Sequence, residues 1–273
     1  MKKMLFFMAL AGATAASQAL AAPIVRQPTG NWVVNFDDAQ CVASRNFGTK
    51  EEPLFLVLKA PAIGDVVQVA VVRSGRGGSP QQLVGSISFD NREAVKTSVL
   101  AYTSGTNSQR IFTANLTNSD FAAAGKATTM LFTGAGQVNE SFSLDKIASV
   151  RTVIGECVAD LREVWNVSAS EDMSPKLRQR ARLAVKRLLS NEDYPDLAAR
   201  KDLQGSVRFV LLVDESGRVA DCTVLETSGV AALDAQGCSK IKDRARFTPA
   251  IGADGKPAKD AYTQRVRWML PED

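Results

Sequence analysis

The sequence contains no histidine, and this absence excludes several kinds of catalytic site. A Ser-His-Asp or Cys-His arrangement cannot be built within the chain, and zinc loses its commonest protein ligand. The four cysteines form no C-x-x-C pair, so we expect neither a metal nor another cofactor. Ser143 and Lys146 have S-x-x-K spacing without the companion motifs, and we interpret Ser143 as the start of a helix. We therefore predict that the protein is not an enzyme.

The net charge is also small, and long apolar runs are few. The chain opens with "MKKMLFFMALAGATAASQALAAP", whose apolar run from residue 4 to about 16 is shorter than the ~20 residues that span a bilayer. Ala19 and Ala21 fit an A-x-A cleavage site. We predict that residues 1–21 are a cleaved signal peptide and that the mature protein is periplasmic and not membrane-spanning. Without the two leader lysines the formal charge is 4 − 2 = +2, which predicts no nucleic-acid partner.

Residues 22–165 are predicted to form a β-rich domain. Short apolar alternations such as "LFLVLKA", "VVQVAVV" and "RIFTANL" run from residue 30 to about 142 and are separated by turn residues. A helical period then closes the domain, with its apolar stripe at Ile147, Val150, Ile154, Cys157 and Leu161. Because Cys157 lies on the inward face and Cys41 follows the first strand, we predict a Cys41–Cys157 disulfide in the oxidising compartment.

Residues 166–191 are predicted to hold a linker and a basic helix. The stretch "NVSASEDMSP" is short and polar. Ser174 and Pro175 then fit the N-cap and first turn of a helix, whose apolar stripe in "KLRQRARLAVKRLL" is Leu177, Ala181, Val185 and Leu188. The simpler interpretation of its basic residues is a solvated face. The alternative is contact with an anionic surface such as lipid or cell-wall polymer.

The last part of the chain begins with a predicted β-hairpin, "GSVRFVLLVDESGRVADCTVLETSG", at residues 205–229. Val210 and Leu212 make both sides of its first strand apolar, which indicates a strand covered on both faces. A helix over residues 231–246 brings Cys238 toward Cys222, and we predict a disulfide between them. A third strand follows at residues 262–270. The crossover helix predicts that the first strand is central and the third lies at an edge.

The amino-acid sequence of this region resembles the TonB C-terminal domain family over residues 192–271. The motifs that carry the resemblance are Tyr194 with Pro195, Ala198, "QGSVRFVLLVDESGRV" at 204–219, Ser228 with Gly229, Leu233 with Asp234, and "RFTPA" at 246–250. The resemblance implies a three-stranded antiparallel sheet with two helices. The expected fold class is therefore α+β, an N-terminal β-rich domain closed by one helix plus this small C-terminal domain, residues 192–273.

Members of this family bind an extended peptide of an outer-membrane transporter by adding it to the sheet edge, which implies a protein or peptide partner here. We predict that the partner meets the third strand, where Arg265 and Arg267 face outward and favour acidic neighbours. The alternative is that these arginines only guard the edge against aggregation. The candidate binding residues are Tyr262, Gln264, Arg265, Val266, Arg267 and Trp268.

The chain also departs from the energy transducer of that family, which keeps an uncleaved N-terminal helix with a histidine and a proline-rich spacer. Here the sequence has a predicted cleavable leader, no histidine and a β-rich domain in place of the spacer. Energy transduction by this polypeptide alone is therefore not expected. A second hypothesis is a ligand sensor or enzyme in the β-rich domain, with the C-terminal domain for docking. A deep pocket lined by ionisable groups within residues 30–165 would favour it. The oligomeric state stays open.

Overall fold

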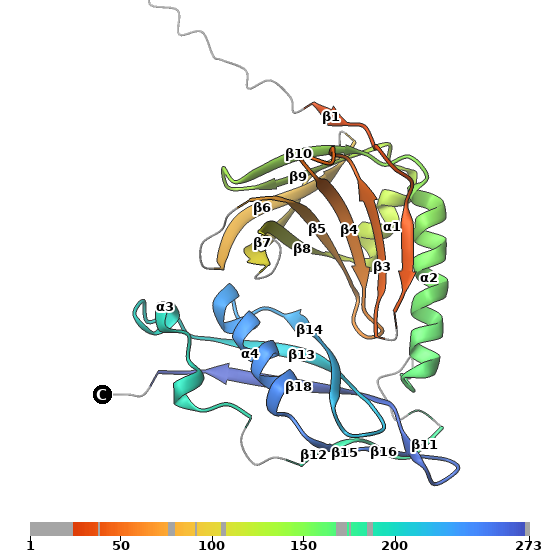
Figure 1. The fold of residues 1–273 in the computed structure, drawn as a ribbon, viewed down its shortest axis with the longest axis vertical. Coiled ribbons are helices and arrows are strands. Elements are labelled where there is room, and N and C mark those ends of the chain that lie inside the picture. Colours follow the sequence, from red (N-terminus) through yellow and green to blue (C-terminus); the bar gives the residue numbers. More distant parts are fainter. Residues whose placement is uncertain are drawn as a thin grey trace, which may run out of the picture.

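The computed structural model describes residues 24–37, 39–75, 80–90, 92–104, 108–167, 174, 176–184 and 188–270. The predicted signal peptide and most of the predicted linker lie outside them. Figure 1 shows an N-terminal domain, residues 24–167, above a C-terminal domain, residues 174–270. Over the described part of the chain, no helix combines the length and the apolar character needed to cross a membrane.

The N-terminal domain contains a ten-stranded sheet with the order β1-β10-β9-β6-β7-β8-β5-β4-β3-β2. Side chains alternate between buried and half-buried along strands such as β4, which confirms the β-rich prediction. Three strands were not predicted: β1, which has only two residues, and β3 and β10, whose alternation is interrupted by polar residues. The strands are β1 Val25–Arg26, β2 Val33–Phe36, β3 Cys41–Asn46, β4 Leu54–Ala60, β5 Val66–Ser74, β6 Gln81–Phe89, β7 Val95–Ser104, β8 Gln109–Thr117, β9 Thr129–Gly134 and β10 Val138–Ser143.

This sheet curls back on itself. β1 and β2 stand at opposite ends of the strand order, yet they are neighbours in sequence. A single chain segment therefore pairs with β10 at one end and with β3 at the other. The curvature is visible in Figure 1, where the strands wrap around an apolar interior. In this way the N-terminal segment covers both ends of the large sheet.

Helix α2, Ile147–Val164, packs against this sheet. All five residues of its predicted stripe are buried, and the predicted Cys41–Cys157 disulfide ties it to β3. Two expectations were wrong. The domain is not closed by one helix alone, since it also contains the short helix α1, Asn118–Ala123. The side chain of Thr117 caps the N-terminus of this helix. Ser143 is the last residue of β10 rather than the start of a helix, because it pairs with Thr129 of β9.

The C-terminal domain contains the predicted three-stranded antiparallel sheet in the order β14-β13-β18. The central strand β13 is Gly205–Val213, β14 is Val219–Glu226 and β18 is Asp260–Trp268. Helix α4, Ala231–Arg244, covers one face, and the predicted Cys222–Cys238 disulfide joins it to β14. The expected second helix is reduced to α3, Asp196–Ala199, which follows the 3-10 turn η2, Asn191–Asp193.

The predicted basic helix is wrong: its described residues form the short strands β11, Leu177–Gln179, and β12, Arg182–Leu183. They pair with β16, Ala250–Gly252, and β15, Phe247–Thr248, while β17, Pro257–Ala258, completes the first of these small sheets. Arg178, Arg180 and Arg182 alternate with period two, a strand signal that competes with the helical stripe. Pairing with the "RFTPA" region decides the outcome, because tertiary contacts override helix propensity.

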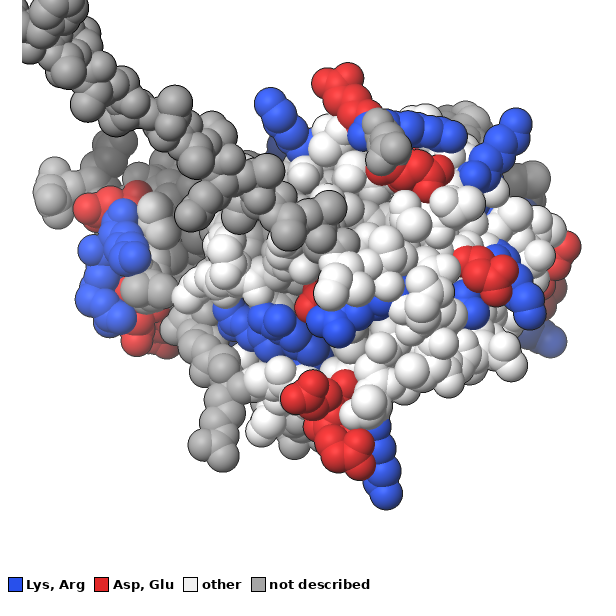
Figure 2. Space-filling view, turned by 90° about the horizontal axis from the view of Figure 1, so that it is seen from above, with Lys and Arg blue, Asp and Glu red and all other residues white. Residues whose placement is uncertain are grey.

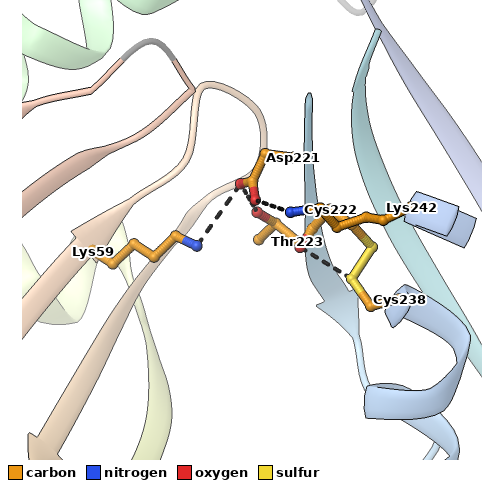
Figure 3. The surroundings of a disulfide bond; sticks show 6 residues. All are labelled: Lys59, Asp221, Cys222, Thr223, Cys238 and Lys242. Carbon is orange, nitrogen blue, oxygen red and sulfur yellow. Dashed lines mark hydrogen bonds and ion pairs between the residues drawn. A yellow bond between two sulfur atoms is a disulfide. The ribbon is translucent and has the colours of Figure 1, made fainter. Parts of the chain in front are cut away.

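The two domains pack through the face of the small sheet that α4 leaves open. Val210, Leu212 and Ala261 belong to the same apolar cluster as the interior of the N-terminal domain, so β13 is covered on both faces as predicted. The Asn166 side chain donates to the Lys259 carbonyl (2.8 Å). Figure 3 shows Asp221 of β14 between Lys59 of the N-terminal domain and Lys242 of α4.

Candidate protein-binding edge

Strand β18 forms one edge of the small sheet. It pairs along its whole length with β13, from Asp260 opposite Val213 to Trp268 opposite Gly205. Within the described residues no strand pairs with its other side. The prediction of an edge strand is therefore confirmed. An unpaired edge presents a row of backbone donors and acceptors that another strand can use.

Two side-chain contacts show which residues direct their backbone groups away from β13. The hydroxyl of Ser206, on β13, donates to the Val266 carbonyl (3.4 Å). The guanidinium of Arg180, which lies outside this sheet, donates to the Ala261 carbonyl. Because the N–H and C=O of successive residues in an antiparallel strand point to opposite sides, even-numbered residues face β13. The outward groups therefore belong to Thr263, Arg265 and Arg267.

The first part of the edge is covered by the basic segment that was predicted to be a helix. Asp260 is fully buried and accepts from Nε of Arg180 and from the backbone N–H of Ala181, both at 2.8 Å. These bonds hold residues 176–184 beside the start of β18 and place Arg180 on the Ala261 carbonyl. The uncovered edge consequently runs from Thr263 to Trp268.

The open part of the edge is flanked by a mostly basic face. Arg208 of β13 is opposite both Arg265 of β18 and Glu226 of β14. The Glu226 carboxylate pairs with Arg208 (3.0 Å) and with Arg265 (3.2 Å), while Arg267 is exposed and makes no ion pair with any described residue. One carboxylate thus stands among three guanidinium groups. This balance favours an acidic segment along the edge.

The opposite edge of the sheet, β14, is turned toward the N-terminal domain. Asp221 pairs with Lys59 at 3.8 Å, and a side chain at Gly64 of the β4–β5 turn would collide with Leu225, since its Cβ would lie 2.5 Å from a Leu225 methyl. Pairing of a partner strand is therefore directed to β18, the edge that lies away from this contact (Figure 1).

The six residues predicted to bind a partner fall into two groups. Val266 and Trp268 are buried and Tyr262 is half-buried, and all three pack in the core under α4. Gln264 is half-buried and its amide donates to the Arg265 carbonyl (2.6 Å). Only Arg265 and Arg267 expose their side chains. The four buried or half-buried residues hold the strand in place, and any contact that they make with a partner is through their backbone groups.

Sequence reasoning missed Arg208 and Glu226 as neighbours of Arg265. The alternation of β13 places Arg208 on the same face as Val210 and Leu212, and that signal was available. The proximity of Arg208 to Arg265 could not be predicted from the sequence. It depends on the register between β13 and β18, which pairs these two residues although they are more than fifty positions apart.

The motifs that resemble the TonB family build the scaffold. The Tyr194 ring packs edge-on against Trp268 at a centroid distance of 5.4 Å, and its hydroxyl donates to the Leu203 carbonyl (2.7 Å). Asp234 is buried and accepts from the Ser228 N–H (2.9 Å) and the Thr227 hydroxyl. These residues position helix α4 and the end of β18, so they explain the fold rather than the binding.

Asp193, just before the Tyr-Pro pair, is a charged anchor of the same scaffold. It is 3% exposed and accepts from the backbone N–H of Ser190 (2.8 Å) and from Arg244 of α4 (2.6 Å). The Ser190 backbone bond, followed by the Arg244 bond, lowers the pKa of Asp193 to about 2. The carboxylate is therefore ionised at any neutral pH and ties η2 to α4.

Residues 190–270 match the family described as Gram-negative bacterial TonB protein C-terminal. The match confirms the predicted resemblance over nearly the same residues. No curated protein matches the chain. A domain of this family is typical of TonB-like proteins of the Gram-negative periplasm, which act in envelope energy transduction or in interactions with proteins such as outer-membrane transporters.

Proposed function

We propose that this chain is a periplasmic binding protein whose C-terminal domain captures an extended, acidic segment of a partner protein as an additional strand on β18. The observation that carries the proposal is the open edge from Thr263 to Trp268, which pairs with β13 on one side and with no described strand on the other. On that outer side the Arg265 carbonyl accepts from the Gln264 side chain, which a partner strand would displace. Main-chain hydrogen bonds would supply affinity, and neighbouring side chains would supply selectivity. An outer-membrane transporter is the class of partner that the family match supports.

The charges around the edge support an acidic partner. Arg265 and Arg267 lie on β18 and Arg208 lies on the adjacent strand, with Glu226 as their one carboxylate. Guarding an edge against aggregation requires exposed charge but not an excess of one sign. The excess of basic groups instead favours opposite charges on the incoming segment and penalises basic ones.

The N-terminal domain takes the place of a spacer in this proposal and acts as a support. It covers the face of β13 that carries Val210 and Leu212 and contacts β14 through Lys59 and Asp221. Of the two edges of the three-stranded sheet, this arrangement leaves β18 as the one that faces away from the larger domain. The lack of histidine supports a binding role rather than catalysis.

The decisive experiment changes the outward backbone of β18 in the full-length protein. Arg267→Pro removes an outward N–H while the bonds to β13 stay in place, because proline is tolerated at an edge position whose N–H faces solvent. We expect this variant to lose a partner that the unchanged protein captures from Gram-negative envelope extracts. Arg267→Ala keeps the N–H and should retain the partner with slightly lower affinity and a weaker dependence on salt.

A second proline variant controls for the substitution itself. Glu215 is the second residue of the Asp214–Gly217 turn, is exposed and stands where proline fits a β-turn. Glu215→Pro should therefore capture the partner as the unchanged protein does. The proposal is wrong if Arg267→Pro, with an unchanged circular dichroism spectrum and Tm, captures the same partner at the same level.

A further inference from the structure

A cavity of about 650 Å³ opens at the end of the N-terminal domain that faces away from the small domain. Its walls are the β3–β4 turn, the ends of β5 and β8, and the β9–β10 turn. The volume lies within the range of small-molecule sites. Figure 2 views the molecule from this end and shows Lys and Arg side chains gathered near the middle of the surface.

Two arginines face this cavity from adjacent strands. Arg73, on β5, is directly opposite Arg110, on β8, in the antiparallel register. Both guanidinium groups flank the ring of Phe112, with their central carbons 5.2 Å and 5.5 Å from its centroid. Like charges directly opposite each other destabilise a sheet, so this pair needs a compensating anion.

The one carboxylate that reaches these groups is already shared. Glu140, on β10, pairs with Arg26 at 3.0 Å and with Arg73 at 3.9 Å. Arg110 makes no ion pair with any described residue. It donates from Nη2 to the Gln137 side chain at 2.9 Å, and its buried Nη1 has no hydrogen-bond acceptor among the described residues.

The contrast with the other buried arginine of the described chain is direct. Arg45 is 5% exposed and Arg110 is 9% exposed. Arg45 pairs with the Asp145 carboxylate (3.6 Å) and donates to the carbonyls of Gly30 (3.0 Å) and Asp145 (2.8 Å). Arg110 has no equivalent of that carboxylate. A buried charge is costly unless it is paired, and this cost falls on Arg110 but not on Arg45.

The charges that line the cavity set the charge of the missing partner. Three arginines line it, Arg26, Arg73 and Arg110, together with the two glutamates Glu52 and Glu140. The balance is 3 − 2 = +1. Residues 76–79 and 105–107, which adjoin β5 and β8 in the sequence, contain no Asp or Glu and add one cation, Arg76. A ligand with one negative charge would neutralise the described lining.

We propose that this cavity binds a small organic anion, whose single carboxylate group pairs with Arg110 beside Arg73. The fork of a guanidinium matches the planar oxygens of a carboxylate. Phe47 and Leu54 line the same cavity, so the organic body of the ligand meets apolar surface. Phosphate fits less well, because it carries more than one negative charge near neutral pH.

The test uses benzoate as the probe and the isotope-labelled full-length protein. Benzoate should shift the backbone amide signals of Gly75, Gly136 and Gln137 in a saturable way, with a Kd of order 1 mM or below. Benzamide, which has the same shape without the charge, should leave them unchanged. Equal shifts with benzamide, or no saturable shift with benzoate, would overturn the proposal.

Two variants assign the binding to Arg110. Arg110→Gln should weaken benzoate binding by about tenfold or more, the usual worth of a hydrogen-bonded charge partner. Arg92→Gln changes an exposed arginine that does not line the cavity and should bind benzoate normally. The proposal fails if Arg110→Gln binds benzoate as tightly as the unchanged protein, or if inorganic phosphate binds more tightly than benzoate.

Discussion

Each of the two main sheets is covered by a helix that a disulfide bond ties to it. The sheets differ in whether their edge strands are covered or left open. In the N-terminal domain β1 and β2 come from one continuous segment and occupy both ends of the strand order. In the C-terminal domain β14 faces the larger domain, and β18 pairs on one side only among the described residues. In the functions proposed above, the large sheet binds a ligand at one end of its interior and the small sheet binds a partner at its edge.

The two proposed kinds of recognition follow from this difference. A curled sheet has an inside, and at one end of it the unbalanced arginines Arg73 and Arg110 face a cavity. An open sheet has backbone groups to offer, and in β18 these belong to Thr263, Arg265 and Arg267. The first arrangement suits a small anion, and the second suits an extended chain.

The disulfides should show the largest difference between the domains. Cys41 and Cys157 enclose a sequence separation of 116, and Cys222 and Cys238 one of 16. In the chain-entropy model their loss costs about 5 and about 3 kcal/mol, respectively. Denaturant unfolding of Cys41→Ala/Cys157→Ala and Cys222→Ala/Cys238→Ala, followed by tryptophan fluorescence, measures both. A larger loss from the shorter loop would contradict the expectation.

A pair of left-handed glycines gives the next effect. Gly217 (φ +77°) lies in the β13–β14 turn, and a Cβ there would come within 2.0 Å of the Phe247 carbonyl oxygen. Gly136 (φ +71°) lies in the β9–β10 turn and has open space around it. Gly217→Ala should cost about 3 kcal/mol or more through strain and overlap, and Gly136→Ala about 1 kcal/mol. Similar Tm shifts for the two variants would show that the Phe247 contact relaxes freely.

The charged anchor of the small domain should make its stability depend on acid. The folded pKa of Asp193, about 2, lies below its ordinary value of 3.8, so its contribution is complete above about pH 4 and is lost as pH falls toward 2. Asp193→Asn should cost about 2 kcal/mol at pH 7. The gap between variant and unchanged protein should narrow at low pH. A gap that is constant from pH 7 to pH 2 would exclude this origin.

The smallest expected effect concerns the open edge itself. Arg267→Ala removes one exposed charge and should weaken partner binding by less than about 1 kcal/mol, with the loss fading at high salt.

Hydrogen exchange of the same strand provides the structural check. The amides of Thr263, Arg265 and Arg267 should exchange fast and become protected by the partner, while those of Gln264 and Val266 are protected throughout. Uniform protection without a partner would mean that the edge is already paired.

Much of the fold could be predicted because its signals are local. The alternation in β4 and β5, the stripe of α2 and the DESG turn are each contained in one short stretch, and each specifies which side chains face inward. The cysteine pairs were accessible for the same reason, since each joins the inward side of a helix to a neighbouring strand. The structure of the basic segment at 176–184 could not be predicted in this way, because a helical period and a strand period compete within the same residues.

The sequence by itself determined most strands of the two domains, helices α2 and α4, both disulfide pairs and the edge position of β18. The tertiary structure alone decided which backbone groups of β18 are open, since Arg180 reaches Ala261 only after β11 and β12 pair with β16 and β15. It also decided that Arg73 and Arg110 meet beside one aromatic ring. The physical reason is strand register: residues far apart in sequence become neighbours through pairings that no local period encodes.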